Sequence, residues 1–137
     1  MKILLRAVAI AMTVVTIGCS SGPDDGSVGP VSVIADSRVT GDSVELRLTP
    51  PAGFTIVAAD GDTSGTTGHY HVFVDRDPVA PGAVIPTEEG IIHSTDNPVV
   101  VDGLEPGMHR FVVVLGDGLH KRIGGSHGEI TVEVVAA

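Results

Sequence analysis

The stretch Ser43-Val44-Glu45-Leu46-Arg47-Leu48-Thr49 alternates apolar and polar residues at every step. Successive side chains of a β-strand point to opposite faces, so its three aliphatic residues share one face. Glu45 and Arg47 share the other face. The stretch therefore predicts a strand with one buried side.

The same texture continues on both sides of this stretch, from Val31 to the C-terminus. Short runs rich in Val and Ile alternate with clusters of Gly, Pro, Asp and Ser, about every ten residues. No stretch shows an extended helical periodicity. We expect strands at residues 31–35, 43–49, 54–58, 69–75, 83–85, 90–93, 98–101, 109–115 and 129–135. About seven to nine short strands in one domain predict an all-β fold, a β-sandwich.

A local motif sharpens this prediction. Leu104-Glu105-Pro106-Gly107-Met108-His109 leads directly into the strand expected at 109–115. Immunoglobulin-like and fibronectin-like domains often carry Leu-x-Pro-Gly-x-Tyr at such a corner, where the tyrosine hydroxyl bonds to the backbone. His109 takes the tyrosine position, from which a ring nitrogen could make a similar bond or face a ligand. The motif favours an immunoglobulin-like or fibronectin-like sandwich.

The N-terminal residues have the features of an export signal. Lys2 and Arg6 precede an apolar run over residues 7–17 that is too short to span a bilayer comfortably. Gly18-Cys19 follows and resembles a lipobox, although Thr16 stands where that pattern prefers Leu. We expect a lipoprotein signal peptide at 1–18, a flexible Gly/Ser/Pro/Asp tether at 19–30, and a single β-sandwich domain at 31–137.

Cys19 is the only cysteine, so no internal disulfide can form. Lipidation would consume the thiol and anchor an exported protein to a membrane facing the periplasm or the cell exterior. No acidic residue directly follows Cys19, a feature that resembles lipoproteins sorted to the outer membrane of Gram-negative bacteria.

Acidic residues outnumber Lys and Arg by 17 to 8, and the formal net charge is −9. A surface of this sign repels phosphate backbones, so we expect no nucleic-acid partner. It attracts cations, including metal ions. The absence of a second cysteine also argues against a blue-copper site, which needs a thiolate.

All six histidines lie in the second half of the chain, at or near the ends of expected strands. In His69-Tyr70-His71 the two imidazoles share one strand face, with Cα atoms about 6.6 Å apart. They can therefore start a zinc or copper site, with further ligands from neighbouring strands. His93, His109 and His120 are the candidates. Asp117 could fix the tautomer of a ligating histidine or bind the metal itself.

The alternative is that these histidines are structural. His69 and His71 share a face with Phe73, whereas Tyr70 lies on the other face with Val72 and Val74. If the histidine face is the core, backbone carbonyls would satisfy the rings. If it is not, the rings would be solvated.

Four motifs taken together resemble a family of bacterial exported proteins grouped as a domain of unknown function. They are Gly68-His69-Tyr70-His71, Ile92-His93, Pro106-Gly107-Met108-His109 and Leu115-Gly116-Asp117-Gly118-Leu119-His120. The resemblance covers about residues 66–135. It implies a secreted β-sandwich with a histidine cluster at these five positions, and no established activity. The chain departs from the family pattern after His120, where Lys121-Arg122-Ile123-Gly124-Gly125 replaces a further histidine and a proline pair.

Other signals are weaker. Asp60-Gly61-Asp62-Thr63-Ser64-Gly65 matches the first half of a calcium loop, but His71 stands where an EF-hand needs Glu, and no flanking helices are expected. We therefore do not expect calcium. The chain has no nucleophile elbow, phosphate loop or dinucleotide motif, so we do not expect an enzyme.

Two hypotheses of function follow. The first is a cell-envelope lipoprotein whose β-sandwich binds copper or zinc through the histidine cluster. The second is a non-catalytic immunoglobulin-like module that binds an envelope protein or a cell-wall glycan, with structural histidines. Convergence of the imidazoles in space would favour the first, and their dispersal the second.

Overall fold

The computed structural model describes residues 28–137, and this part of the chain contains nine β-strands and no helix. It accordingly offers no helix that could cross a membrane. The predicted all-β class is confirmed. The strands are β1 (Ser32–Ile34), β2 (Arg38–Thr40), β3 (Val44–Thr49), β4 (Thr55–Ile56), β5 (Thr67–Val74), β6 (Ile91–Ser94), β7 (Val99–Val101), β8 (Gly107–Gly116) and β9 (Gly128–Val135).

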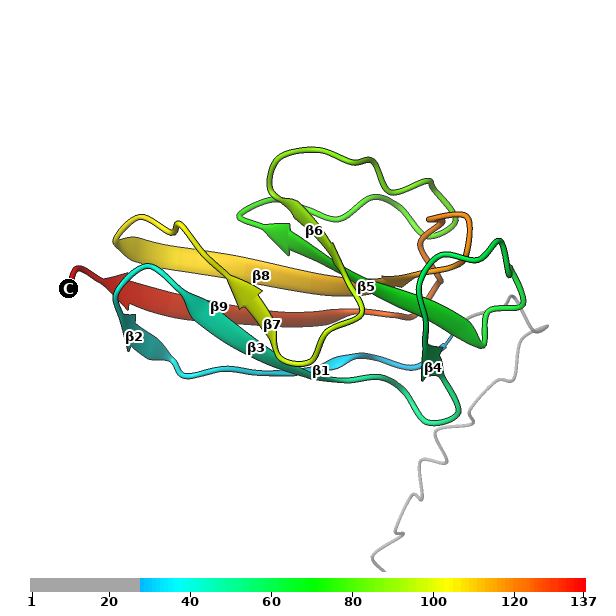
Figure 1. Ribbon diagram of the computed structural model, residues 1–137, viewed down its shortest axis with the longest axis horizontal. Helices are drawn as coiled ribbons and strands as arrows, with labels where there is room; N and C mark the ends of the chain where they lie inside the picture. The colour runs from blue at the N-terminus through cyan, green and yellow to red at the C-terminus, as the bar shows by residue number, and fades with distance from the viewer. Residues whose placement is uncertain (1–27) are drawn as a thin grey trace, which may run out of the picture.

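The strands form two layers, as Figure 1 shows. The smaller sheet has the order β1-β3-β7 and is antiparallel. The larger sheet has the order β2-β9-β8-β5-β4, and β6 pairs with β5 as well. Its central pairs are antiparallel, whereas the short edge strands β2 and β4 run parallel to their neighbours.

The main core lies between the two layers. The alternation of β3 buries its three aliphatic residues and leaves Glu45 and Arg47 exposed, as predicted. Burial of each large apolar side chain contributes about 1.5–3 kcal/mol, so aliphatic residues suffice with few aromatics. The architecture is an immunoglobulin-like β-sandwich, which confirms the predicted fold. Its buried residues include Val44, Leu46, Leu48, Tyr70, Val72, Val99, Val101, Phe111, Val113, Leu115, Val132 and Val134.

A second, smaller core lies on the outer face of the larger sheet. It joins Phe73 of β5 to Val112 and Val114 of β8, and to Ile85 and Ile91. The long connection between β5 and β6 passes over this face (Figure 1). Strand β5 is therefore buried on both sides: Tyr70 and Val72 face the main core, and the histidine face belongs to the second layer of packing.

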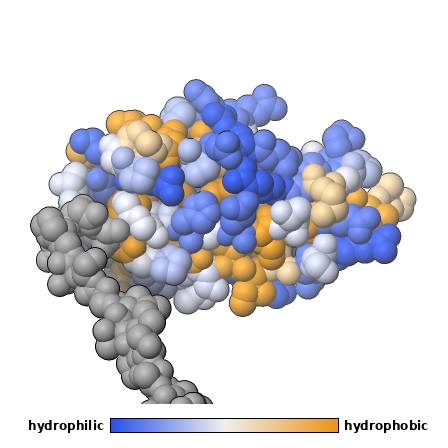
Figure 2. All heavy atoms as spheres, turned by 180° about the vertical axis from the view of Figure 1, so that it is seen from behind, coloured by the Kyte–Doolittle hydropathy of each residue, from blue (hydrophilic) through white to orange (hydrophobic). Residues whose placement is uncertain are grey.

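The outer surface is mixed. On the face shown in Figure 2, hydrophobic residues form separate patches among hydrophilic ones. The large hydrophobic side chains that are exposed belong to different parts of the fold: Ile34, Val84, Val100, Met108 and Leu119. Scattered apolar residues of this kind are ordinary on protein surfaces.

Two predictions about the elements need correction. Residues 83–85 form no strand, because Val84 makes only an isolated bridge to Lys121. Strand β2 was not predicted, since three residues between polar turns carry little periodicity. On the N-terminal side of β1, the Val28 amide donates to the Gly124 carbonyl at 2.8 Å. The expected signal peptide, Cys19 and most of the expected tether lie outside the described residues.

Candidate metal centre

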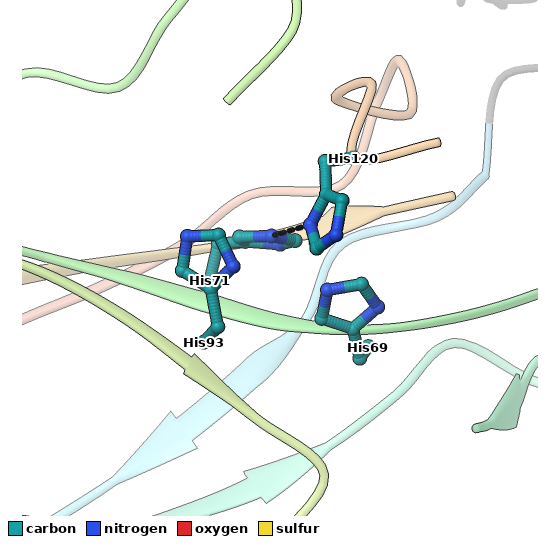
Figure 3. Close-up of side chains that lie close together, drawn as sticks. All are labelled: His69, His71, His93 and His120. Carbon is teal, nitrogen blue, oxygen red and sulfur yellow. Dashed lines mark hydrogen bonds between the residues drawn. The ribbon is translucent and has the colours of Figure 1, made fainter. Parts of the chain in front are cut away.

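Four histidines converge at one end of the larger sheet. His69 and His71 come from β5, His93 from β6, and His120 from the turn after β8. One ring nitrogen of each lies within 4.8 Å of one nitrogen of every other. Figure 3 shows the four rings facing one another around a common centre. Residues as far apart in sequence as His69 and His120 thus present nitrogen ligands to a single point.

Strand pairing explains how three of these rings meet. His69 and His71 lie on the same face of β5, with ring centroids 4.4 Å apart. His93 is the direct cross-strand partner of His71, and their centroids are 4.3 Å apart. The Nε2–H of His93 donates to the Pro86 carbonyl at 3.4 Å, which leaves the lone pair on Nδ1.

A tight turn holds the fourth ring. The carboxylate of Asp117 accepts from the backbone amides of Leu119 and Lys121, at 2.9 and 3.0 Å. The amide of His120 donates to the Asp117 carbonyl, and His120 has a φ of 58° in the left-handed region. This conformation is strained for a residue with a side chain, and it brings His120 Nδ1 to 3.4 Å from His71 Nε2.

Gly116 makes room for His71. A Cβ at position 116 would lie 2.3 Å from Cε1 and 2.7 Å from Nδ1 of the His71 ring. No side chain fits there while the ring keeps its place. The ring that packs over Gly116 explains the glycine in the Leu115-Gly116-Asp117 motif, a role that depends on the pairing of β5 with β8 and carries no signal in the sequence.

Burial keeps two of the rings neutral. His71 is fully buried and His69 is 4% exposed. Desolvation, reinforced by the other three histidines, lowers the pKa of His71 to about 2. Desolvation and the neighbouring His120 and His93 lower the pKa of His69 to about 4. Neutral imidazole is the form that binds metals, so both rings carry an available lone pair near pH 7.

Two buried ring nitrogens have no protein partner within the described residues. Within the described residues, Nδ1 of His69 is buried without a hydrogen bond, and so is Nδ1 of His71, which lies against Gly116. Buried polar atoms are normally paired, because an unpaired one costs free energy. A metal ion would satisfy a nitrogen that faces the cluster.

The spacing suits a transition metal. Zn–N bonds of about 2.0–2.1 Å place the nitrogens of a tetrahedral site about 3.3 Å apart. The 3.4 Å between His71 Nε2 and His120 Nδ1 is close to this value and long for a hydrogen bond. Ligand nitrogens that lie farther apart, up to 4.8 Å, would have to move inward to complete such a site.

The fifth predicted ligand lies elsewhere. His109 is not among the clustered residues; its Nε2–H donates to the Glu105 carbonyl and its Nδ1–H to Asp75, each at 2.6 Å. Both ring nitrogens donate, and these contacts, the Glu105 carbonyl first, raise the pKa of His109. Of the two roles left open for His109, these contacts fit the corner residue, and the ring lies outside the cluster.

The acidic residues singled out in the sequence, Asp117 and the loop at 60–65, make hydrogen bonds within their own turns. No hydrogen bond joins Asp117 to an imidazole within the described residues, so it acts on the cluster by holding the turn that carries His120. In the loop at 60–65, Asp62 accepts hydrogen bonds from Ser64 and Thr67, and the Ser64 amide is the main cause of its lowered pKa. This loop is organised by its own hydrogen bonds.

Comparisons with known proteins find one family match and one distant structural likeness. No curated protein matches the chain significantly. Among solved structures, the PKD domain (329–428) of human KIAA0319 is similar, with 18% identity, a TM-score of 0.38, and coverage of 88% of this chain and 94% of that one. The family described as "Domain of unknown function (DUF4399)" matches residues 51–135, a range that contains all four clustered histidines. Since this match spans more than half of the chain, the protein belongs to the DUF4399 family.

Proposed function

We propose that this protein is a cell-envelope lipoprotein whose β-sandwich binds copper or zinc through His69, His71, His93 and His120. One observation carries the metal assignment: four imidazoles from two strands and a turn present nitrogens within 4.8 Å of one another. The alternative, an interaction module with structural histidines, would leave these rings dispersed among backbone partners.

The ligand chemistry supports copper(II) or zinc. Imidazole nitrogen is a borderline ligand that suits both ions, whereas Mg²⁺ and Ca²⁺ prefer oxygen. The rings are placed on two hydrogen-bonded strands and a carboxylate-braced turn, so little ordering is needed on binding. Sequestration, delivery or sensing of the metal in the envelope would each use such a site.

The membrane anchor is a separate part of the proposal. It rests on Lys2, Arg6, the apolar run at 7–17 and Gly18-Cys19. Mass spectrometry of the protein from membranes of the expressing cell should find the chain starting at a diacylated Cys19. A Cys19→Ser variant should lose the lipid, and an unmodified Cys19 thiol in the wild type would refute the anchor.

Metal binding is tested by isothermal titration of the full chain with Cu(II) and with Zn(II). We expect one tight site that the His69→Ala/His71→Ala double variant loses. The matched control is His109→Ala/His127→Ala, which also removes two histidines but lies outside the cluster. Weak binding by the wild type, or an equal loss of binding in both double variants, would refute the proposed metal site.

A further inference from the structure

A pocket opens beside the histidine cluster. Its volume is about 250 Å³, and three of the four histidines line it: His69, His93 and His120. His71 does not line it and is fully buried. The cluster therefore has a closed side, formed by His71, and an open side toward the pocket.

The pocket combines apolar and hydroxyl groups. Ala58 and Ala59 contribute methyl groups, and Ser94 and Thr95 follow His93 at the end of β6. The Ser94 Oγ accepts from the Asp96 amide at 2.9 Å, so its own hydroxyl hydrogen is free to donate. A hydroxyl that donates beside a metal position favours a ligand with negative charge.

The charge of a bound metal ion also favours an anionic ligand. An imidazole binds a metal in its neutral form, so four such ligands would leave a bound divalent ion with its full positive charge. Asp117 is close enough to act on the pKa of His69, but its carboxylate already accepts two backbone amides of the turn. A divalent cation with this one carboxylate nearby is compensated only in part, and beside an open pocket it attracts an anion.

We propose that copper(II) held by these four histidines accepts a fifth ligand from the pocket side, and that a small anion occupies this position with Ser94 and Thr95 as hydrogen-bond donors. The fitting class is a small carboxylate or a linear or planar inorganic anion. This inference rests on the proposed metal site. Because the domain as a whole is acidic, the anion would bind only through the metal.

The test uses the full chain loaded with one equivalent of Cu(II) and titrated with azide, and then with formate as a competitor. Azide should produce a saturable charge-transfer absorption and change the electron paramagnetic resonance spectrum, and formate should reverse both. The Ser94→Ala/Thr95→Val variant should bind Cu(II) as the wild type does but azide about tenfold more weakly, as expected for one or two lost hydrogen bonds.

The outcomes separate the two proposals. A chain that binds no Cu(II) overturns the metal site and this inference with it. A chain that binds Cu(II) tightly, with spectra that azide leaves unchanged, keeps the metal site and overturns the open position. Azide affinity that is equal in the wild type and the Ser94→Ala/Thr95→Val variant overturns the assignment of the anion to this pocket.

Discussion

Nε2 of His71 lies 3.4 Å from Nδ1 of His120, although the two residues are 49 positions apart in the sequence. The two rings are held in place in different ways. His71 is fixed in the middle of β5 and fully buried, whereas His120 sits on a turn with a left-handed backbone. Strain at the residue that completes a cluster is typical of sites that trade stability for function.

Two substitutions of His120 distinguish the effect of losing the imidazole from the effect of the strained backbone. Both His120→Gly and His120→Ala should lose the tight metal site, because both remove the same imidazole. In the metal-free state, His120→Gly should be the more stable of the two by about 1 kcal/mol, since only alanine keeps the cost of the left-handed conformation. Urea unfolding and metal titration of the pair measure the two effects. Equal stability of the two variants would argue against strain at this position.

The metal-free protein should lose stability as the pH falls. The pKa values of His69 and His71 are lowered on folding, to about 4 and about 2, from an unfolded value of about 6.5. Below pH 6.5 the unfolded chain binds protons that the folded chain cannot, so acid favours unfolding. Each ring contributes a slope of up to about 1.4 kcal/mol per pH unit between pH 6.5 and its folded pKa. Urea unfolding at pH 7, 6 and 5 measures this slope.

The variant His71→Leu tests whether this pH dependence comes from the cluster, and His127→Ala is its control. His71→Leu removes the ring with the lower pKa and should flatten the pH dependence between pH 5 and 6.5, whatever its effect on stability at pH 7. His127→Ala, which removes an exposed histidine next to Glu129, should leave the slope from the cluster in place. A slope that His71→Leu does not change would mean that this ring is protonated in the folded protein.

Gly116→Ala should damage the metal site more than the fold. The new methyl group would overlap the His71 ring, which must rotate away from the cluster. Displacing a ligand through a neighbour typically costs about 10–100-fold in metal affinity, and overpacking costs about 1–3 kcal/mol of stability. Gly29→Ala is the matched control, because its new methyl group would meet only Pro51, at 3.4 Å. Unchanged metal affinity in Gly116→Ala would show that the ring has room to adjust.

Much of the fold could be predicted because strand alternation depends on local sequence. The buried face of the 43–49 stretch was predicted correctly, because a strand with one solvated side alternates apolar and polar residues. Prediction failed where burial comes from tertiary packing. Val84 and Ile85 carry a strand-like composition but lie in the connection that covers the second core, and β5 is buried on both faces, which period-two alternation alone cannot reveal.

The site could be predicted in part for the same reason. The i, i+2 spacing of His69 and His71 places both rings on one strand face whatever the rest of the fold does. His93 joins them only through the pairing of β6 with β5, and His120 only through the Asp117 turn. His109 has the same residue type and similar strand-end placement, but it lies near the start of β8, beside Asp75, whereas the cluster lies in space at the other end of that strand. Sequence alone could not give that separation.

The corner contact of His109 yields the last prediction, which separates this ring from the cluster. His109→Ala should leave metal affinity unchanged and cost about 1–3 kcal/mol of stability, because it leaves the Glu105 carbonyl and Asp75 without their shared donor. The pKa of His109 is raised on folding, first by the Glu105 carbonyl and then by Asp75. Its contribution should therefore be complete below pH 6.5 and fade as the pH rises through the raised value, opposite in sign to the cluster. Urea unfolding of the wild type and His109→Ala at pH 6 and pH 9 checks this: a stability difference that grows with pH, or a loss of metal binding in the variant, would contradict the corner assignment.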